Sequence, residues 1–88
     1  MKIEFLSKFD KDLDKILDSD LLENIANLIE QVENAENITE LKNVKKMVGS
    51  KNAYRIKLGK YRIGFYYENQ VIEFARIVHC KDIYQVFP

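Results

Sequence analysis

Three segments in the second half of the chain alternate apolar and polar residues, and only a few residues separate them. The segments are Ala53–Leu58, Tyr61–Tyr67 and Val71–His79. Alternation with a period of two residues indicates strands that bury one face. The dipeptides Gly59-Lys60 and Asn69-Gln70 predict tight two-residue turns between them. The pattern therefore predicts an antiparallel meander.

The first half of the chain predicts one strand and two helices. Met1–Leu6 alternates in the same way, and Ser7 is expected to cap a helix that follows it. The apolar stripe of this helix consists of Phe9, Leu13, Ile16 and Leu17. After a polar break, Asp20 is expected to cap a second helix. The wider apolar face of that helix consists of Leu21, Leu22, Ile25, Leu28, Ile29 and Val32.

The order of these elements predicts an α+β fold. An N-terminal strand and a helical hairpin pack on an antiparallel meander of three to four strands, with Val44–Val48 as the weaker candidate for the fourth. Eighty-eight residues leave room for one hydrophobic core, so residues 1–88 are expected to form a single domain. No apolar run is long enough to cross a membrane. Cys80 is the only cysteine, which argues against an internal disulfide or a cysteine zinc site and favours a reducing cytoplasm.

The charges are divided unevenly between the two halves of the chain. Residues 1–41 carry four lysines and eleven acids, a net charge of −7, and residues 42–88 carry ten basic groups and three acids, a net charge of +7. A concentration of Lys and Arg in one region is typical of a surface that meets a polyanion. The second half is therefore expected to carry a nucleic-acid interface, and the acids of the first half are interpreted as solvated helix surface.

The first predicted turn determines which basic side chains share a face of the sheet. Around Gly59-Lys60, antiparallel pairing places Lys57 opposite Arg62 and Arg55 opposite Gly64. Two cations directly across a strand pair repel each other by up to ~1 kcal/mol, and a bound anion would relieve that repulsion. We therefore expect one cationic face that binds an anion. Exposed basic residues that only keep the protein soluble are the alternative interpretation.

The second predicted turn, Asn69-Gln70, extends this register to the last strand. The expected pairs are Phe65 with Phe74 and Arg62 with Ile77. This register brings His79 beside Lys60 on the cationic face. It directs Arg76 toward the helices, where an acidic side chain of a helix is its expected partner. The apolar and aromatic residues after Lys81 are expected to fold back on the sheet.

Two stretches of the chain, YRIKLGKYRIGFYY (54–67) and IVHCKDIYQVFP (77–88), resemble the C-terminal half of toxins of the RelE/ParE superfamily. The order of the predicted elements is similar too, so the resemblance covers the whole chain. It implies the RelE-like fold and the toxin component of a type II toxin-antitoxin system, with a cognate antitoxin as partner. For the RelE type it implies an endoribonuclease that cuts mRNA in the A site of the ribosome, with neither a metal ion nor a small-molecule cofactor.

The resemblance also implies roles for individual residues. The residues that match catalytic positions are Lys57, Arg62, His79 and Tyr84, and the expected RNA-binding residues are Arg55, Lys60, Lys81 and Arg76. In the implied reaction a ribose 2′-oxygen attacks the adjacent phosphorus and leaves a 2′,3′-cyclic phosphate. Lys57 or His79 would accept the 2′-hydroxyl proton, the arginines would stabilise the phosphorane, and His79 or Tyr84 would protonate the leaving oxygen. Cys80 occupies the position of an arginine that commonly helps to hold the scissile phosphate in this family.

Two other functions share the same fold. A ParE-like inhibitor of DNA gyrase acts by binding a protein, and such chains generally lack the basic pair combined with a tail tyrosine or histidine. A RelE-like chain weakened in catalysis by Cys80 would persist as a binding module. The retained basic pair favours the endoribonuclease over the gyrase inhibitor, and purified protein in a translation extract would distinguish all three functions.

Overall fold

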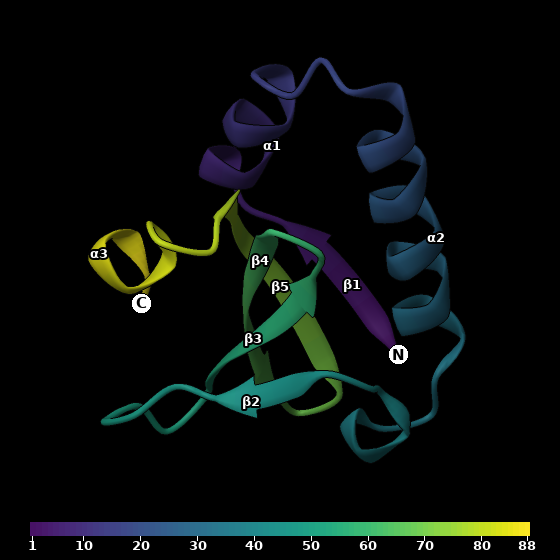
Figure 1. Ribbon diagram of the computed structural model, residues 1–88. Helices are drawn as coiled ribbons and strands as arrows, with labels where there is room; N and C mark the ends of the chain where they lie inside the picture. The colour runs from purple at the N-terminus through teal and green to yellow at the C-terminus, as the bar shows by residue number, and fades with distance from the viewer.

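The core of the fold is a five-stranded sheet with helices on both of its faces (Figure 1). The computed structural model describes all residues from Met1 to Pro88. The strands are β1 (Lys2–Phe5), β2 (Val44–Lys46), β3 (Ala53–Leu58), β4 (Tyr61–Glu68) and β5 (Val71–His79). Their order across the sheet is β1-β5-β4-β3-β2, with β1 parallel to β5 and every other pair antiparallel. The α+β fold and the four-stranded meander are confirmed, but β1 joins the same sheet as a fifth, parallel strand.

The two predicted hairpin turns form where the sequence places them. Between β3 and β4, Lys57 pairs with Arg62 and Leu58 with Tyr61, as predicted. Between β4 and β5, Asn69 and Gln70 have φ angles of 53° and 64°. Two successive residues with positive φ are the signature of a type I′ turn, whose twist matches that of the strands it joins. The pairing of β3 with β4 also places Arg55 opposite Gly64, so the first hairpin carries Arg55, Lys57 and Arg62 on one face, as predicted.

A β-bulge interrupts the pairing of β4 with β5 and corrects the predicted register. Phe65 pairs with Phe74 as expected, but the next pair is Gly64 with Arg76, so that Ala75 is the extra residue. A regular strand would have placed Arg76 opposite Ile63, beneath the helices, where burial of a guanidinium is costly. The bulge instead turns Ile77 into the core, and from that point every pair is displaced by one residue.

Two helices, α1 (Ser7–Asp14) and α2 (Ser19–Asn34), cover one face of the sheet (Figure 1). The predicted stripes are confirmed in part, because Phe9, Ile25 and Val32 are buried whereas Leu17 is almost fully exposed. The largest fully buried side chains under the helices are Phe9, Ile25, Val32, Ile56, Ile63, Phe65, Ile72 and Phe74. This layer is the main hydrophobic core.

Both predicted helix caps differ in the structure. Helix α1 is preceded by Leu6, which makes no side-chain capping bond, and Ser7 is already its first residue. The cap of α2 is Asp18, whose carboxylate accepts hydrogen bonds from the backbone N–H groups of Asp20 and Leu21. The expected cap, Asp20, lies inside the first turn, where a carboxylate still interacts favourably with the helix dipole.

The opposite face of the sheet is covered by the end of the chain. A short helix, α3 (Ile83–Val86), lies on the other side of the sheet from α2 (Figure 1). The second buried cluster consists of Met47, Ala53, Ala75, Ile83 and Phe87. Gly64 is buried beneath Phe87, and a Cβ atom placed on it would lie 2.6 Å from the Phe87 ring. The tail therefore folds back on the sheet as predicted, and Gly64 provides the space for its aromatic anchor.

No helix of the protein is both long enough and apolar enough to cross a membrane.

Candidate functional site

Four basic side chains extend from the face of the sheet that α3 covers only in part. Lys57 pairs with Arg62 across β3 and β4, and Lys45 of β2 pairs with Arg55 of β3. Directly paired residues lie on the same face, and residues two apart on a strand share it, so all four point to the side of α3. Ala53 lies on the same face of β3 and is buried against the tail. We call Lys45, Arg55, Lys57 and Arg62 the cationic face.

The cationic face has no acidic counterpart. The protein contains one salt bridge, between Arg76 and Asp12, and none of the four side chains takes part in it. The acids nearest in register on this face are Glu73, which pairs with Tyr66, and Glu4, which pairs with Glu73 at the far edge of the sheet. Like charges that face each other without a counterion are destabilising. A bound anion would neutralise this arrangement.

Tyr84 of α3 lies directly at the cationic face. The Nε–H group of Arg55 donates a hydrogen bond of 3.1 Å to the Tyr84 hydroxyl oxygen. The Tyr84 side chain is two-thirds exposed, whereas its neighbours Ile83 and Phe87 are buried and fix α3 to the sheet. A tyrosine from the tail is thus fixed beside an arginine of the sheet, with its ring open to solvent.

The hairpin turn orients Arg62. Its Nη1 atom donates hydrogen bonds to the carbonyl oxygens of Gly59, at 2.9 Å, and Tyr61, at 2.8 Å. Neither Nε nor Nη2 donates to any protein acceptor. A fixed guanidinium with donors to spare is suited to bind a phosphate oxygen.

Arg76 is bound to a helix acid, as predicted. Its Nε and Nη2 atoms donate to the Asp12 carboxylate at 2.8 and 3.1 Å, and the Ile77 N–H donates to the same carboxylate at 3.0 Å. The hydrogen bond to Asp12 and its negative charge raise the pKa of Arg76 above the ordinary arginine value, against a smaller opposing effect of burial. Arg76 pairs with Gly64 rather than facing the helices, and two of its three nitrogens donate to Asp12. The structure therefore separates it from the four free cations.

His79 lies on the other face of the sheet, contrary to the expected register. The bulge pairs it with Tyr61 instead of Lys60, and the two rings meet edge to face with centroids 5.8 Å apart. Tyr61 packs against the core under the helices, so the His79 ring is directed away from Arg62. The His79 Nδ1 atom accepts a hydrogen bond of 3.3 Å from the Lys81 N–H, which leaves Nε2 as its free nitrogen.

Cys80 and the two remaining predicted residues lie at the end of β5. Lys60 and Lys81 are exposed, and the Cys80 N–H donates a 2.7 Å hydrogen bond to the Lys60 carbonyl oxygen. The Cys80 thiol is half-buried, 3.7 Å from Nδ1 of His79, and does not belong to the buried core. No cluster of three His, Cys, Asp or Glu side chains that could hold a metal ion is present.

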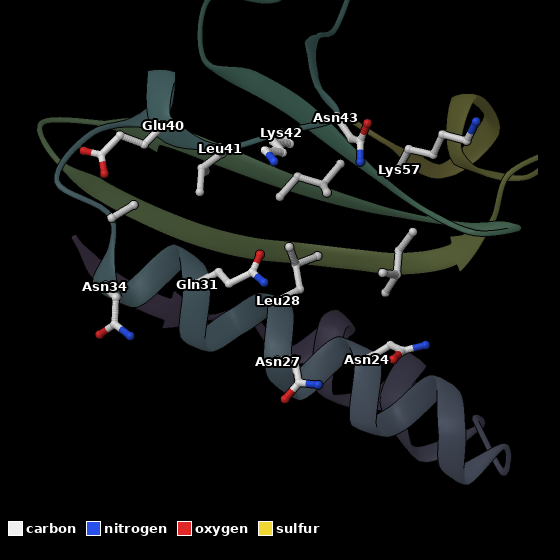
Figure 2. A pocket seen from close by; sticks show the side chains of 13 residues that line it. Asn24, Asn27, Leu28, Gln31, Asn34, Glu40, Leu41, Lys42, Asn43 and Lys57 are labelled. Atoms are coloured by element: carbon white, nitrogen blue, oxygen red, sulfur yellow. The ribbon is translucent and has the colours of Figure 1, made fainter.

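A groove that the sequence did not predict runs between α2 and the edge of the sheet. It encloses about 790 Å³ and is lined by α2, residues 40–43 and the end of β3. Leu28 and Gln31 project from α2 toward Leu41 on the opposite wall, and Lys57 stands at one end with its amine turned away from α2 (Figure 2). The amides that line α2 are Asn24, Asn27, Gln31 and Asn34, and their spacing of three or four residues was the available signal.

Known proteins similar to this chain are toxins. The family described as ParE toxin of type II toxin-antitoxin system, parDE, matches residues 3–84. Toxin RelE3 of Methanocaldococcus jannaschii is 39% identical over 89 residues, covering 100% of both chains. The crystal structure of a RelB-RelE antitoxin-toxin complex from Methanococcus jannaschii matches with a TM-score of 0.81 and 36% identity, over 97% of this chain and 99% of that one. The archaeal RelE-RelB complex from Pyrococcus horikoshii has the same fold, with a TM-score of 0.69 and 18% identity over 89% and 92% of the two chains. The chain therefore belongs to the RelE/ParE superfamily of toxins from type II toxin-antitoxin systems.

Proposed function

We propose that the protein is a ribosome-dependent mRNA endonuclease that works without a metal ion. The observation that carries this proposal is the hydrogen bond of Arg55 to Tyr84, which holds the tail tyrosine beside the unpaired cations Lys57 and Arg62. A phosphate with its flanking nucleotides would neutralise these cations and offer a base to the exposed Tyr84 ring. A surface that only kept the protein soluble would not need an ordered tyrosine in contact with it.

The proposed reaction transfers a phosphoryl group within the RNA chain. The 2′-hydroxyl loses its proton to Lys57, which acts in this step as the neutral amine and becomes the ammonium. The 2′-oxygen forms a bond to phosphorus, and the bond from phosphorus to the 5′-oxygen breaks. Arg62 donates to the oxygens of this phosphate, on which negative charge increases in the transition state. The Tyr84 hydroxyl gives a proton to the leaving 5′-oxygen. The products are a 2′,3′-cyclic phosphate and a free 5′-hydroxyl.

The position of His79 favours Lys57 and Tyr84 for the two proton transfers. Because His79 faces the helix side of the sheet, a phosphate held by Arg62 would not meet its ring directly. We therefore propose that His79 supports the end of β5 through Tyr61 and the Lys81 N–H, rather than acting as base or acid. The ribosome would supply the in-line geometry of the RNA, and alignment of that kind is worth about 7–11 kcal/mol of a barrier.

A translation extract with a reporter mRNA tests this function. Primer extension should reveal cuts that appear only when the mRNA is translated, with 5′-hydroxyl ends and 2′,3′-cyclic phosphates. EDTA should not abolish cleavage of mRNA already held on purified ribosomes under conditions in which the ribosomes remain assembled. An intact mRNA in the presence of correctly folded protein would refute the proposal.

A ParE-like inhibitor of DNA gyrase is the second candidate, favoured by the family that matches residues 3–84. Such a protein would stop supercoiling by purified gyrase and leave translated mRNA intact. A RelE-like binding module weakened by Cys80 would do neither and would still bind its antitoxin. The same two assays therefore distinguish all three functions.

A cognate antitoxin is the proposed protein partner, because the solved relatives include RelB-RelE complexes. The groove along α2 offers it an apolar floor with a rim of amides that can bond to a backbone. Since Lys57 stands at one end of that groove, an acidic segment continuing from it would reach the cationic face. Protection of Lys57 from acylation in a co-purified complex would test this arrangement.

A further inference from the structure

Lys45 extends the cationic face beyond the residues that the family resemblance assigns to catalysis. It lies on β2, the edge strand, and pairs directly with Arg55. Adjacent strands are about 4.8 Å apart, so the two side chains leave the sheet as close neighbours on the side of α3. Neither side chain has an acidic partner.

The four cations therefore form two successive rows across the sheet. One row contains Lys45 and Arg55, and the other contains Lys57 and Arg62. Because Arg55 and Lys57 are two positions apart on β3, the rows are separated by about 6.6–6.8 Å. Successive phosphates of an extended nucleic-acid strand lie at a similar spacing, so that each row can meet one phosphate.

Arg55 contacts Tyr84 and also belongs to the row that contains Lys45. Its Nε atom is directed to Tyr84, while its two terminal nitrogens make no hydrogen bond within the protein. Those nitrogens are free to meet a phosphate beside the Lys45 amine. The Tyr84 contact holds the guanidinium in place, which reduces the conformational entropy lost when an anion binds.

We propose that Lys45 and Arg55 form a second phosphate subsite, which holds the phosphate next to the one held by Lys57 and Arg62 in a single strand of RNA. This rests on the proposed function, because it assumes that RNA is the polyanion. The two subsites together define the path of the RNA strand over the sheet, which runs between the hairpin turn of β3 and β4 and the edge strand β2. Lys45 is accordingly a substrate-binding residue outside the centre of the reaction.

The neighbouring residue Lys46 provides a matched control. It lies on the same strand, is also exposed, and carries the same charge. Lys46 pairs with Tyr54, whose ring stacks on Phe65 on the helix-covered side of the sheet, so Lys46 points to the opposite face. Lys45→Ala and Lys46→Ala therefore change the net charge equally and differ only in the face they alter.

The test measures binding of a short single-stranded RNA by fluorescence anisotropy across a series of salt concentrations. Loss of one phosphate contact should reduce the slope of log K against log salt by about 0.7 for Lys45→Ala. Between 50 and 200 mM salt, the wild type should then lose about 2.6-fold more affinity than this variant. Lys46→Ala should keep the slope of the wild type.

Equal slopes for the two variants would overturn the subsite, and so would a wild type that does not bind RNA at low salt. The translation extract is run with the same proteins to separate this result from the proposed function. A reduced slope for Lys45→Ala together with intact translated mRNA would support the subsite as an RNA contact and overturn the endonuclease.

Discussion

Replacement of Gly64 by alanine should release the tail that carries Tyr84. A Cβ atom on Gly64 would lie 2.6, 2.7 and 2.8 Å from three carbon atoms of the Phe87 ring, far inside van der Waals contact. The ring is almost completely buried and stands on Gly64 in the middle of β4, so a small shift does not relieve the clash. Either the ring is compressed into a strained position or α3 leaves the sheet, and in both cases the Arg55 contact to Tyr84 is disturbed.

The size of the effect follows from the packing. Overpacking of a filled site costs about 1–3 kcal/mol, and loss of the buried Phe87 side chain costs about the same. An alanine in a strand interior otherwise gains about 0.5–1 kcal/mol over glycine. A net loss of about 1–2 kcal/mol in the free energy of unfolding is therefore expected, which lowers the Tm of a domain of this size by roughly 4–16 °C.

A double-mutant cycle with Phe87→Ala isolates the cause. On that background the ring is absent, so Gly64→Ala should be neutral or slightly stabilising, and the coupling between the two changes should exceed about 1.5 kcal/mol. Thermal and urea melts of the four proteins measure it, and mRNA cleavage by Gly64→Ala should fall more than its folded fraction does. If Gly64→Ala destabilised both backgrounds equally, the contact with Phe87 would not be its cause.

Three further changes address other parts of the site. Arg62→Ala should lower the rate of mRNA cleavage about 10²–10³-fold while thermal melts stay close to those of the wild type, because the repulsion with Lys57 that it removes offsets the loss of the hydrogen bonds that Arg62 donates to the turn. A collapse of stability would mean that the pair is structural. Asp12→Ala should cost about 3 kcal/mol in urea melts, since it leaves the Arg76 guanidinium without its counterion, and an unchanged melt would contradict the role given to this ion pair. Cys80→Arg should raise the rate of cleavage seen by primer extension, because the half-buried thiol lies at the exposed end of β5 where a guanidinium has room to reach phosphate; slower cleavage with a lower Tm would place Cys80 in the packing instead.

The local pattern of the sequence was sufficient to predict the hairpins and the cationic pairs. Alternation of polar and apolar residues between two short turns leaves a single register that buries the apolar set, so the pairing of Lys57 with Arg62 followed directly. The helix faces around Phe9 and Ile25 were equally predictable, because a stripe of apolar residues needs no knowledge of its partner.

The remaining features depend on contacts between distant segments. The bulge at Ala75 arises because Ile77 and Phe74 must both face the core although three positions separate them, and period-two reasoning does not allow for that. The ion pair of Asp12 with Arg76 joins residues 64 positions apart. Lys45 was missed because β2 is only three residues long, and the side of the sheet to which its side chains point is known only once its pairing with β3 is known.

The bulge at Ala75 also determines which residue of β5 could be deleted without changing the rest of the sheet. Removal of that one residue would turn β5 into a regular strand and leave every later pair unchanged, from Gly64 with Arg76 to Tyr61 with His79. Loss of Arg76 would also leave a regular strand, but it would remove the ion pair with Asp12. Loss of Phe74 would remove a core side chain, and loss of Glu73 would turn a core residue to the opposite face. We therefore expect length variation among relatives in this strand to concentrate at position 75. An alignment that puts the gap after His79 would assign this histidine to the wrong face of the sheet.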